Sequence, residues 1–338
     1  VETKQKIDAD TDKATLKKQV EELEKAANKY LRPYPHSSWR ENVEVFLVAI
    51  AVAMAIRTFF IQPFKIPTGS MQPTLYGVTV DNYRNDETVH FPTGWKRFVD
   101  AMVRGTFYHH MVAEEDFELL DVRHRQVARF INKHDLLVRT ASGEQKVIPV
   151  WFSPDERFVG WAGFDQKRTF RKGEDIFKLK EVTGDHLFVD RLTYNFRRPQ
   201  RGDIIVFATA GIQGLEQNLF YIKRLVGLGG ETIRLGPDRH VWIDGERLDA
   251  STPRFENIYS FDPNKPPQSD EYSGHYFPQT VEYDIRPNHY FVLGDNTMNS
   301  LDSRAWADFS RENVIGKSFF VYWPIANRGE SRFGLGYR

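Results

Sequence analysis

The chain has 338 residues, and its hydrophobic fraction of 41% and aromatic fraction of 14% are typical of a globular protein rather than a disordered one. Its formal net charge is +0, with 46 basic residues against 46 acidic ones, so the basic surplus that nucleic-acid binding requires is missing. Because the sequence has no cysteine, disulfides, cysteine ligands for zinc and a cysteine nucleophile are excluded.

The N-terminal segment, residues 1–42, is polar and is predicted to be partly helical. Its apolar residues recur at helical spacing: Leu16, Val20, Leu23, Ala26 and Ala27. Residues 43–62 follow, and within them the stretch from Val45 to Ile61 is apolar apart from Arg57 and Thr58. A helix needs about 20 such residues to cross a bilayer, so this stretch predicts one transmembrane anchor, which Pro63 ends. A buried core helix is the alternative, whereas the long polar segment before it argues against a signal peptide.

Beyond the anchor the sequence predicts a mostly β protein. Short β-branched or aromatic segments are flanked by Gly, Asp, Asn or Pro: 203–207, 232–235, 240–244 and 289–293. The region 77–183 differs, with an amphipathic helix marked by Trp95, Phe98, Val99, Met102 and Val103 and a hairpin over 133–150 around Ser142-Gly143. We therefore expect a catalytic β domain formed by 63–76 and 184–338, and an α+β insertion over 77–183 whose role the sequence leaves open.

The clearest chemical motif directly follows the anchor and reads PTGSMQPTL, with Ser70 at its centre. By itself it indicates only a turn, because a serine hydroxyl is a poor nucleophile without a base. None of the 10 histidines lies in a motif that suggests a catalytic triad. The alternative base is a lysine whose pKa burial lowers, and Lys223 lies in the apolar segment LFYIKRLVG.

A third motif, GDNTMNSLDSRAW over residues 294–306, is rich in Asn, Asp and Ser. Such a segment is typical of a hydrogen-bonded loop or of a cation-binding loop. It lacks the Glu that closes an EF-hand, so calcium binding is not expected, and no metal site is predicted.

Taken in order, the anchor, PTGSMQPTL, GDHLFVDR (184–191), RGDIIVF (201–207), YIKRLVGLGGE (221–231) and GDNTMNSLDSRAW resemble the motif series of bacterial signal peptidase I. The resemblance implies a signal-peptidase-like β-barrel or sheet core and a serine endopeptidase that uses no cofactor or metal. It implies Ser70 as the nucleophile, Lys223 as the general base, and Thr68 with the Ser70 backbone N–H as the oxyanion hole. Ser300 matches a serine that orients the lysine amine.

The same resemblance assigns structural and substrate-binding roles. Asp295, Asp302 and Arg304 match residues that support the final loop, the last two as an ion pair. Four apolar residues match the walls of pockets for small side chains at Ala-x-Ala cleavage sites: Phe64, Ile66, Tyr221 and Ile222. The departures from the family pattern are Thr297, where Arg is frequent, Gly229, where Pro is common, and Ala307-Asp308, where Gly-Phe is usual.

The resemblance also implies the partners and the location. The partners are preproteins that carry signal peptides and the lipid bilayer, with a position near the secretion translocon. The location is the bacterial cytoplasmic (inner) membrane, crossed once, with the catalytic domain on the extracytoplasmic side. Another Ser/Lys enzyme remains an alternative, although the S-x-x-K motif of penicillin-recognising acylases would need Lys where Pro73 stands. A further alternative is an inactive or specialised homologue that acts through its insertion as a partner-binding module.

Overall fold

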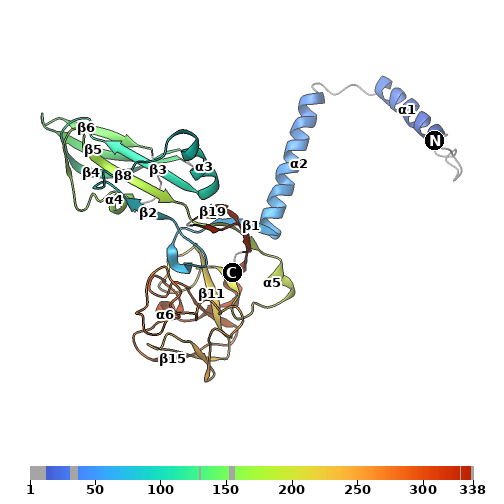
Figure 1. Ribbon diagram of the computed structural model, residues 1–338. Helices are drawn as coiled ribbons and strands as arrows, with labels where there is room; N and C mark the ends of the chain where they lie inside the picture. Colours follow the sequence, from blue (N-terminus) through green and yellow to red (C-terminus); the bar gives the residue numbers. More distant parts are fainter. Residues whose placement is uncertain (1–12, 31–36, 129–130, 152–156, 328, 336–338) are drawn as a thin grey trace. The chain divides into compact units, whose positions relative to one another are not determined.

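The computed structural model describes residues 13–30, 37–128, 131–151, 157–327 and 329–335 (Figure 1). The chain divides into two compact units, residues 1–57 and residues 58–338. The first is helical and the second is mostly β, which confirms the predicted fold class.

The first unit contains two helices, α1 (Lys13–Tyr30) and the greater part of α2 (Ser37–Phe59). The apolar residues of α1 that suggested an amphipathic helix, Leu16, Val20 and Leu23, are exposed. In α2 the segment Trp39–Phe59 is long and apolar enough to cross a membrane, and none of it is buried against other parts of the protein. It is the helix expected from residues 43–62.

The predicted end of this helix was wrong by several residues. The helix ends at Phe59, and Ile61–Lys65 form strand β1 instead, with Pro63 opposite Phe188 of strand β9 (His186–Asp190). Strand β1 is at the edge of its sheet, where a proline removes no hydrogen bond that a second neighbour would need. Proline therefore did not mark the helix end here.

The main sheet of the second unit contains eight strands, and all its pairings are antiparallel. In order they are β1, β9, β18 (Val314–Trp323), β10 (Ile204–Ala208), β11 (Phe220–Leu228), β16 (His289–Leu293) and β17 (Phe309–Ser310), with β21 (Gly334–Leu335) pairing with β18. Both faces are buried: Ile204 and Val206 lie in one apolar cluster, and Ile205 and Phe207 lie in another. This division follows from the alternation of side chains along a strand.

A smaller antiparallel sheet and several short elements complete the core. They are β14 (Glu246–Arg247), β13 (Trp242–Ile243), β12 (Thr232–Leu235) and β15 (Val281–Asp284) in one sheet; the pair β19 (Ala326–Asn327) and β20 (Glu330–Ser331); α5 (Thr193–Phe196) and α6 (Ser303–Trp306); and the 3-10 turns η1 (Gly69–Met71) and η2 (Arg311–Asn313). The expected strands at 232–235 and 289–293 are present with those bounds. The strand expected at 240–244 is shorter, spanning Trp242–Ile243.

The region 77–183 forms two sheets and two helices. One sheet has the order β2 (Thr79–Asn82), β8 (Asp175–Val182), β3 (Thr106–Val112), and the other β6 (Gln145–Val150), β5 (Ile131–Thr140), β4 (Phe117–Ala128), β7 (Thr169–Phe170); the helices are α3 (Gly94–Arg104) and α4 (Phe158–Trp161). Both the amphipathic helix and the hairpin around Gly143 are therefore confirmed. Helix α3 stops at Gly105, whose φ of 59° is left-handed, a conformation that favours glycine.

Candidate functional site

Ser70 lies in the 3-10 turn η1, directly after the edge strand β1. The turn is closed by a hydrogen bond from Gln72 N to Gly69 O at 3.0 Å, and Leu75 N donates to Met71 O at 2.9 Å. Met71 and Leu75 are fully buried in an apolar cluster, and their packing holds the turn in place. Ser70 is 7% exposed. The local sequence therefore holds the hydroxyl on a rigid support.

Lys223 lies on the central strand β11 and is 4% exposed. Its Nζ donates to Ser70 Oγ at 2.5 Å and to the carbonyl oxygen of Ile222 at 3.1 Å. Its Nζ also lies 5.5 Å from the centre of the Tyr221 ring. The two residues that the sequence proposed as nucleophile and base are thus in direct contact, although 153 positions separate them.

Burial lowers the pKa of Lys223 from 10.5 to about 8. The carboxylates of Asp302 and Asp295 oppose this shift because they stabilise the ammonium, and the guanidinium of Arg304 adds to it. With a pKa near 8, roughly one molecule in ten carries a neutral amine at pH 7. Such an amine can accept the Ser70 proton.

The final loop, residues 294–306, lies against the nucleophile turn. Asn296 donates through its backbone N to Ser70 O at 3.2 Å and through Nδ2 to Gly69 O at 3.0 Å. The approach is so close that a Cβ on Gly294 would lie 2.4 Å from Ser70 O and 2.1 Å from Ser300 Oγ. Only a glycine fits there, which gives the Gly-Asp-Asn sequence a structural reason.

Two buried ion pairs hold this loop. Asp302 accepts from Arg304 Nε and Nη2, both at 2.8 Å, and from the backbone N of Gly294 at 2.9 Å. Burial alone would raise the pKa of Asp302, but the hydrogen bonds and charge of Arg304 hold it below its usual value. Asp295 forms the second pair, accepting from Arg224 Nε at 2.8 Å and Nη2 at 2.7 Å. Sequence reasoning named Asp295 but missed Arg224, its partner from the strand that carries Lys223.

Thr68 and Ser300 are near the dyad without hydrogen-bonding it. Thr68 is the exposed residue before η1, and its side chain makes no capping bond. Ser300 Oγ is buried and has no hydrogen bond of acceptable geometry among the described residues, to Lys223 or to any other group. A looser interaction with the Asp302 carboxylate still helps to lower that group's pKa.

The four residues predicted to line substrate pockets are divided between two apolar clusters. Ile66 is 3% exposed and packs with Phe64 and Ile222 in the cluster beneath the nucleophile turn. Tyr221 belongs to the cluster on the other side, where its ring lies 6.1 Å from that of Phe207. The structure thus brings three of the four together.

The position where the family often has Arg is occupied by Thr297, which is buried. Its Oγ1 accepts from Tyr276 N at 2.7 Å and from Arg304 Nη1 at 3.0 Å, so a hydroxyl ties the loop to residue 276.

No group of His, Asp and Glu side chains that could hold a metal ion occurs in the described part of the chain.

Comparison with known proteins identifies related sequences. Residues 39–88 and 179–323, more than half of the chain, match the family model described as signal peptidase, peptidase S26. Signal peptidase I of Leptolyngbya laminosa is 34% identical over 177 residues, which cover 51% of this chain and 76% of that protein. Signal peptidase I of Pseudomonas aeruginosa is 30% identical over 174 residues, covering 42% of this chain and 60% of that protein.

A crystal structure of a signal peptidase I from Enterococcus faecalis V583 is 26% identical in sequence, with a TM-score of 0.27. The alignment covers 36% of this chain and 97% of that chain. The relationship to the signal peptidases rests on the sequences. The family match leaves out residues 89–178, which lie within the insertion.

Proposed function

The chain belongs to the signal peptidase family, peptidase S26, and we propose that it removes signal peptides from exported preproteins with Ser70 as nucleophile and Lys223 as general base. The observation that carries these roles is the 2.5 Å contact between Lys223 Nζ and Ser70 Oγ in a buried environment that lowers the lysine pKa. An inactive homologue is not favoured, because the relatives are signal peptidases and the two reactive groups meet.

The mechanism follows from the state of these two groups. Neutral Lys223 accepts the hydroxyl proton of Ser70 as its Oγ attacks the carbonyl carbon before the cleaved bond. The lysine then gives that proton to the leaving amine, and water hydrolyses the acyl-enzyme with Lys223 again as base. No step requires a metal ion or a cofactor.

The oxyanion of the tetrahedral intermediate needs hydrogen-bond donors fixed in advance. We propose that the backbone N–H of Ser70 and the hydroxyl of Thr68 are these donors. Thr68 is exposed and therefore accessible to a substrate. We propose that Ser300 orients the Lys223 amine. Its buried hydroxyl lacks a partner of good geometry among the described residues, so it is available for that contact when substrate binds.

We propose that the small side chains of an Ala-x-Ala site contact Phe64, Ile66 and Ile222. Tyr221 borders the same pocket through its contact with Lys223.

The decisive experiment is cleavage of a preprotein with an Ala-x-Ala site by the full chain in detergent or liposomes. Wild type is expected to cut after the final Ala, whereas Ser70→Ala and Lys223→Ala are expected to be inactive. The matched control is Lys180→Ala, which removes a lysine of strand β8 in the insertion and should leave cleavage intact. If Lys223→Ala still cleaves at close to the wild-type rate, the assignment of the base is wrong.

We further propose that α2 anchors the chain in the bacterial cytoplasmic membrane with the catalytic domain on the extracytoplasmic side, close to the secretion translocon. The apolar segment Trp39–Phe59 supports the anchor, and the short distance along the chain from Phe59 to Ser70 keeps the site near the bilayer that presents the signal peptide. The absence of cysteine makes sidedness testable: Ser142→Cys in the insertion hairpin should react with a membrane-impermeant maleimide added outside intact spheroplasts. Reaction only after lysis would reverse the orientation.

We propose that residues 63–76 and 184–338 constitute the catalytic domain and that 77–183 form a separate insertion. This division is supported by the break in the family match over 89–178 and by the insertion's own apolar cluster. Three fully buried rings, Phe158, Phe164 and Phe170, lie in that cluster.

A further inference from the structure

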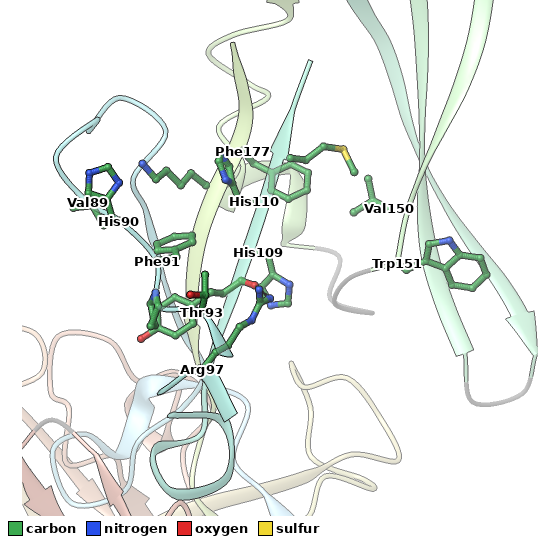
Figure 2. Close-up of a pocket in the computed structure, with 14 residues that line it drawn as sticks. Val89, His90, Phe91, Thr93, Arg97, His109, His110, Val150, Trp151 and Phe177 are labelled. Carbon is green, nitrogen blue, oxygen red and sulfur yellow. Dashed lines mark hydrogen bonds between the residues drawn. The ribbon is translucent and has the colours of Figure 1, made fainter. Parts of the chain in front are cut away.

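A cavity of about 470 Å³ lies in the insertion, away from the Ser/Lys site (Figure 2). Its walls come from the loop before α3, helix α3 itself, strands β3 and β8, and the end of strand β6 with the residue after it. This volume is within the roughly 300–1,000 Å³ that small-molecule sites occupy. The family match does not include residues 89–178, which supply all of its lining residues.

The cavity is lined by cationic and aromatic groups, and none of its lining residues in the described part of the chain is a carboxylate. The lining residues are Val89, His90, Phe91, Pro92, Thr93, Arg97, Tyr108, His109, His110, Met111, Val150, Trp151, Phe177 and Lys178. Figure 2 shows Phe91, Arg97 and the two adjacent histidines of strand β3 around one part of the space, with Val150 and Trp151 on the strand opposite. The acids near these histidines, Asp175 and Glu181, are outside the lining set.

Lys178 is the group that points most strongly to a ligand. It is 8% exposed and its Nζ donates to the backbone oxygen of Asp86 at 3.0 Å, while the Phe91 ring centre lies 6.0 Å away. Within the described part of the chain no carboxylate comes within ion-pairing distance of Lys178. The Asp86 carboxyl interacts with it only weakly, because the pKa of Asp86 is lowered mainly by hydrogen bonds from Thr88, and Lys178 contributes least to that shift. A buried ammonium that forms no direct ion pair is costly, so the site favours an anion.

Arg97 places a second cation at the same cavity. Its Nη2 donates to the backbone oxygen of Tyr108 at 2.5 Å, and no carboxylate pairs with it in the described ranges. Between the two cations are aromatic faces: the Phe91 ring lies 5.0 Å from that of Tyr108 and 6.4 Å from that of His110. Aromatic walls bind an apolar body, and fixed cations bind its charged end.

We propose that this cavity is a binding site for an organic anion, a phosphate or carboxylate group carried on an apolar or aromatic body. Lys178 and Arg97 bind the anionic group, and the Phe91 and Tyr108 rings contact the body. Such chemistry has two sources, a soluble organic anion and the headgroup region of an anionic phospholipid. The proposal is independent of the peptidase activity, because none of these residues belongs to the Ser70–Lys223 site.

The test uses the full chain, labelled with an environment-sensitive fluorophore at Val89→Cys on the cavity wall, since the protein has no other cysteine. For a soluble source, phenyl phosphate is titrated into protein in uncharged detergent, with benzyl alcohol as the neutral comparison. For a lipid source, the same protein is placed in nanodiscs of phosphatidylcholine with and without phosphatidylglycerol. A saturable response in one arm identifies the source.

Whichever arm responds, Lys178→Gln and Arg97→Gln should each weaken binding about 10- to 100-fold, the value of one charge-assisted hydrogen bond. Lys180→Gln, on the same strand but outside the cavity lining, should bind as wild type does. Arg97 is exposed, so its variant tests the proposal even if Lys178→Gln does not fold. Silence in both arms, equal binding of benzyl alcohol, or unchanged binding by both variants would overturn the proposal.

Discussion

Two buried lysines, one in the catalytic sheet and one in the insertion, differ in what lies beside them. Lys223 on β11 is 4% exposed and donates to the hydroxyl of Ser70, whereas Lys178 on β8 is 8% exposed and donates to a backbone carbonyl. The first contacts Ser70, the proposed nucleophile, and the second lines a cavity to which the described residues contribute no carboxylate. Burial of a lysine is therefore not by itself a sign of catalysis.

The two sites relieve the same cost of burial in different ways. Around Lys223 the pKa falls to about 8, so a neutral amine is accessible near physiological pH and can accept a proton. At Lys178 we propose instead that an external anion binds the side chain. The comparison separates deprotonation from ligand binding as outcomes of burial.

The largest expected effect is on peptide cleavage. Lys223→Met should lower kcat/KM by at least about 10⁴-fold, because loss of a dyad member removes nearly all of the nucleophile's activation. Lys178→Met should change it by less than about twofold, since it contacts no reacting group. Both values come from cleavage of an Ala-x-Ala preprotein by the full chain. A large loss in Lys178→Met would show that the insertion lysine acts in catalysis after all.

The second effect is on stability and compares two carboxylates. Asp295→Asn should lower the free energy of unfolding by about 3–5 kcal/mol, because it leaves the buried Arg224 guanidinium without its counter-charge. Asp175→Asn removes the partner of the exposed His110 in the insertion and should cost less than about 1 kcal/mol. Urea unfolding of the full chain in detergent measures both. Equal losses would mean that burial of the Arg224–Asp295 pair does not set its contribution.

The third effect concerns the cost of keeping Lys223 buried. The pKa of Lys223 is about 8 in the folded protein, against a reference value of 10.5. Its burial therefore lowers the free energy of unfolding by the full amount below pH 8, and this loss disappears as the pH rises to about 10.5. Lys223→Met should therefore increase the free energy of unfolding by about 1–3 kcal/mol at pH 7 and by little at pH 10.5. Unfolding curves at the two pH values measure it. A destabilised Lys223→Met at pH 7 would mean that the ammonium is well stabilised.

The fourth prediction concerns the pH dependence of cleavage. Below the Lys223 pKa, kcat/KM should rise about tenfold per pH unit, because the fraction of neutral amine rises in that proportion, and it should level off above about pH 8. Lys178→Met should show the same profile as wild type. The measurement is kcat/KM between pH 5.5 and 9.5 on a substrate without titrating groups. A flat profile across this range would exclude lysine as the general base.

Much of the catalytic site was predictable because its signals are local in sequence. The motif around Ser70 and the apolar segment around Lys223 each suggested chemistry that neither could perform alone, and the resemblance of the whole motif series joined them. The apolar run that forms α2 and the strands at 232–235 and 289–293 were also predictable, since hydrophobic composition and turn residues act over a few positions. The end of α2 was not, because pairing with β9 formed a strand where the sequence permitted more helix.

What the sequence determined by itself was therefore the class of elements, the membrane-span candidate and the choice of Ser70 and Lys223 as the residues proposed to react. Only the tertiary structure decided that Arg224 pairs with Asp295, that Asn296 binds the nucleophile turn, and that Lys178 and Arg97 line one cavity. These contacts join residues that are remote in sequence. Their strength depends on burial, which sheet packing sets and which no local pattern specifies.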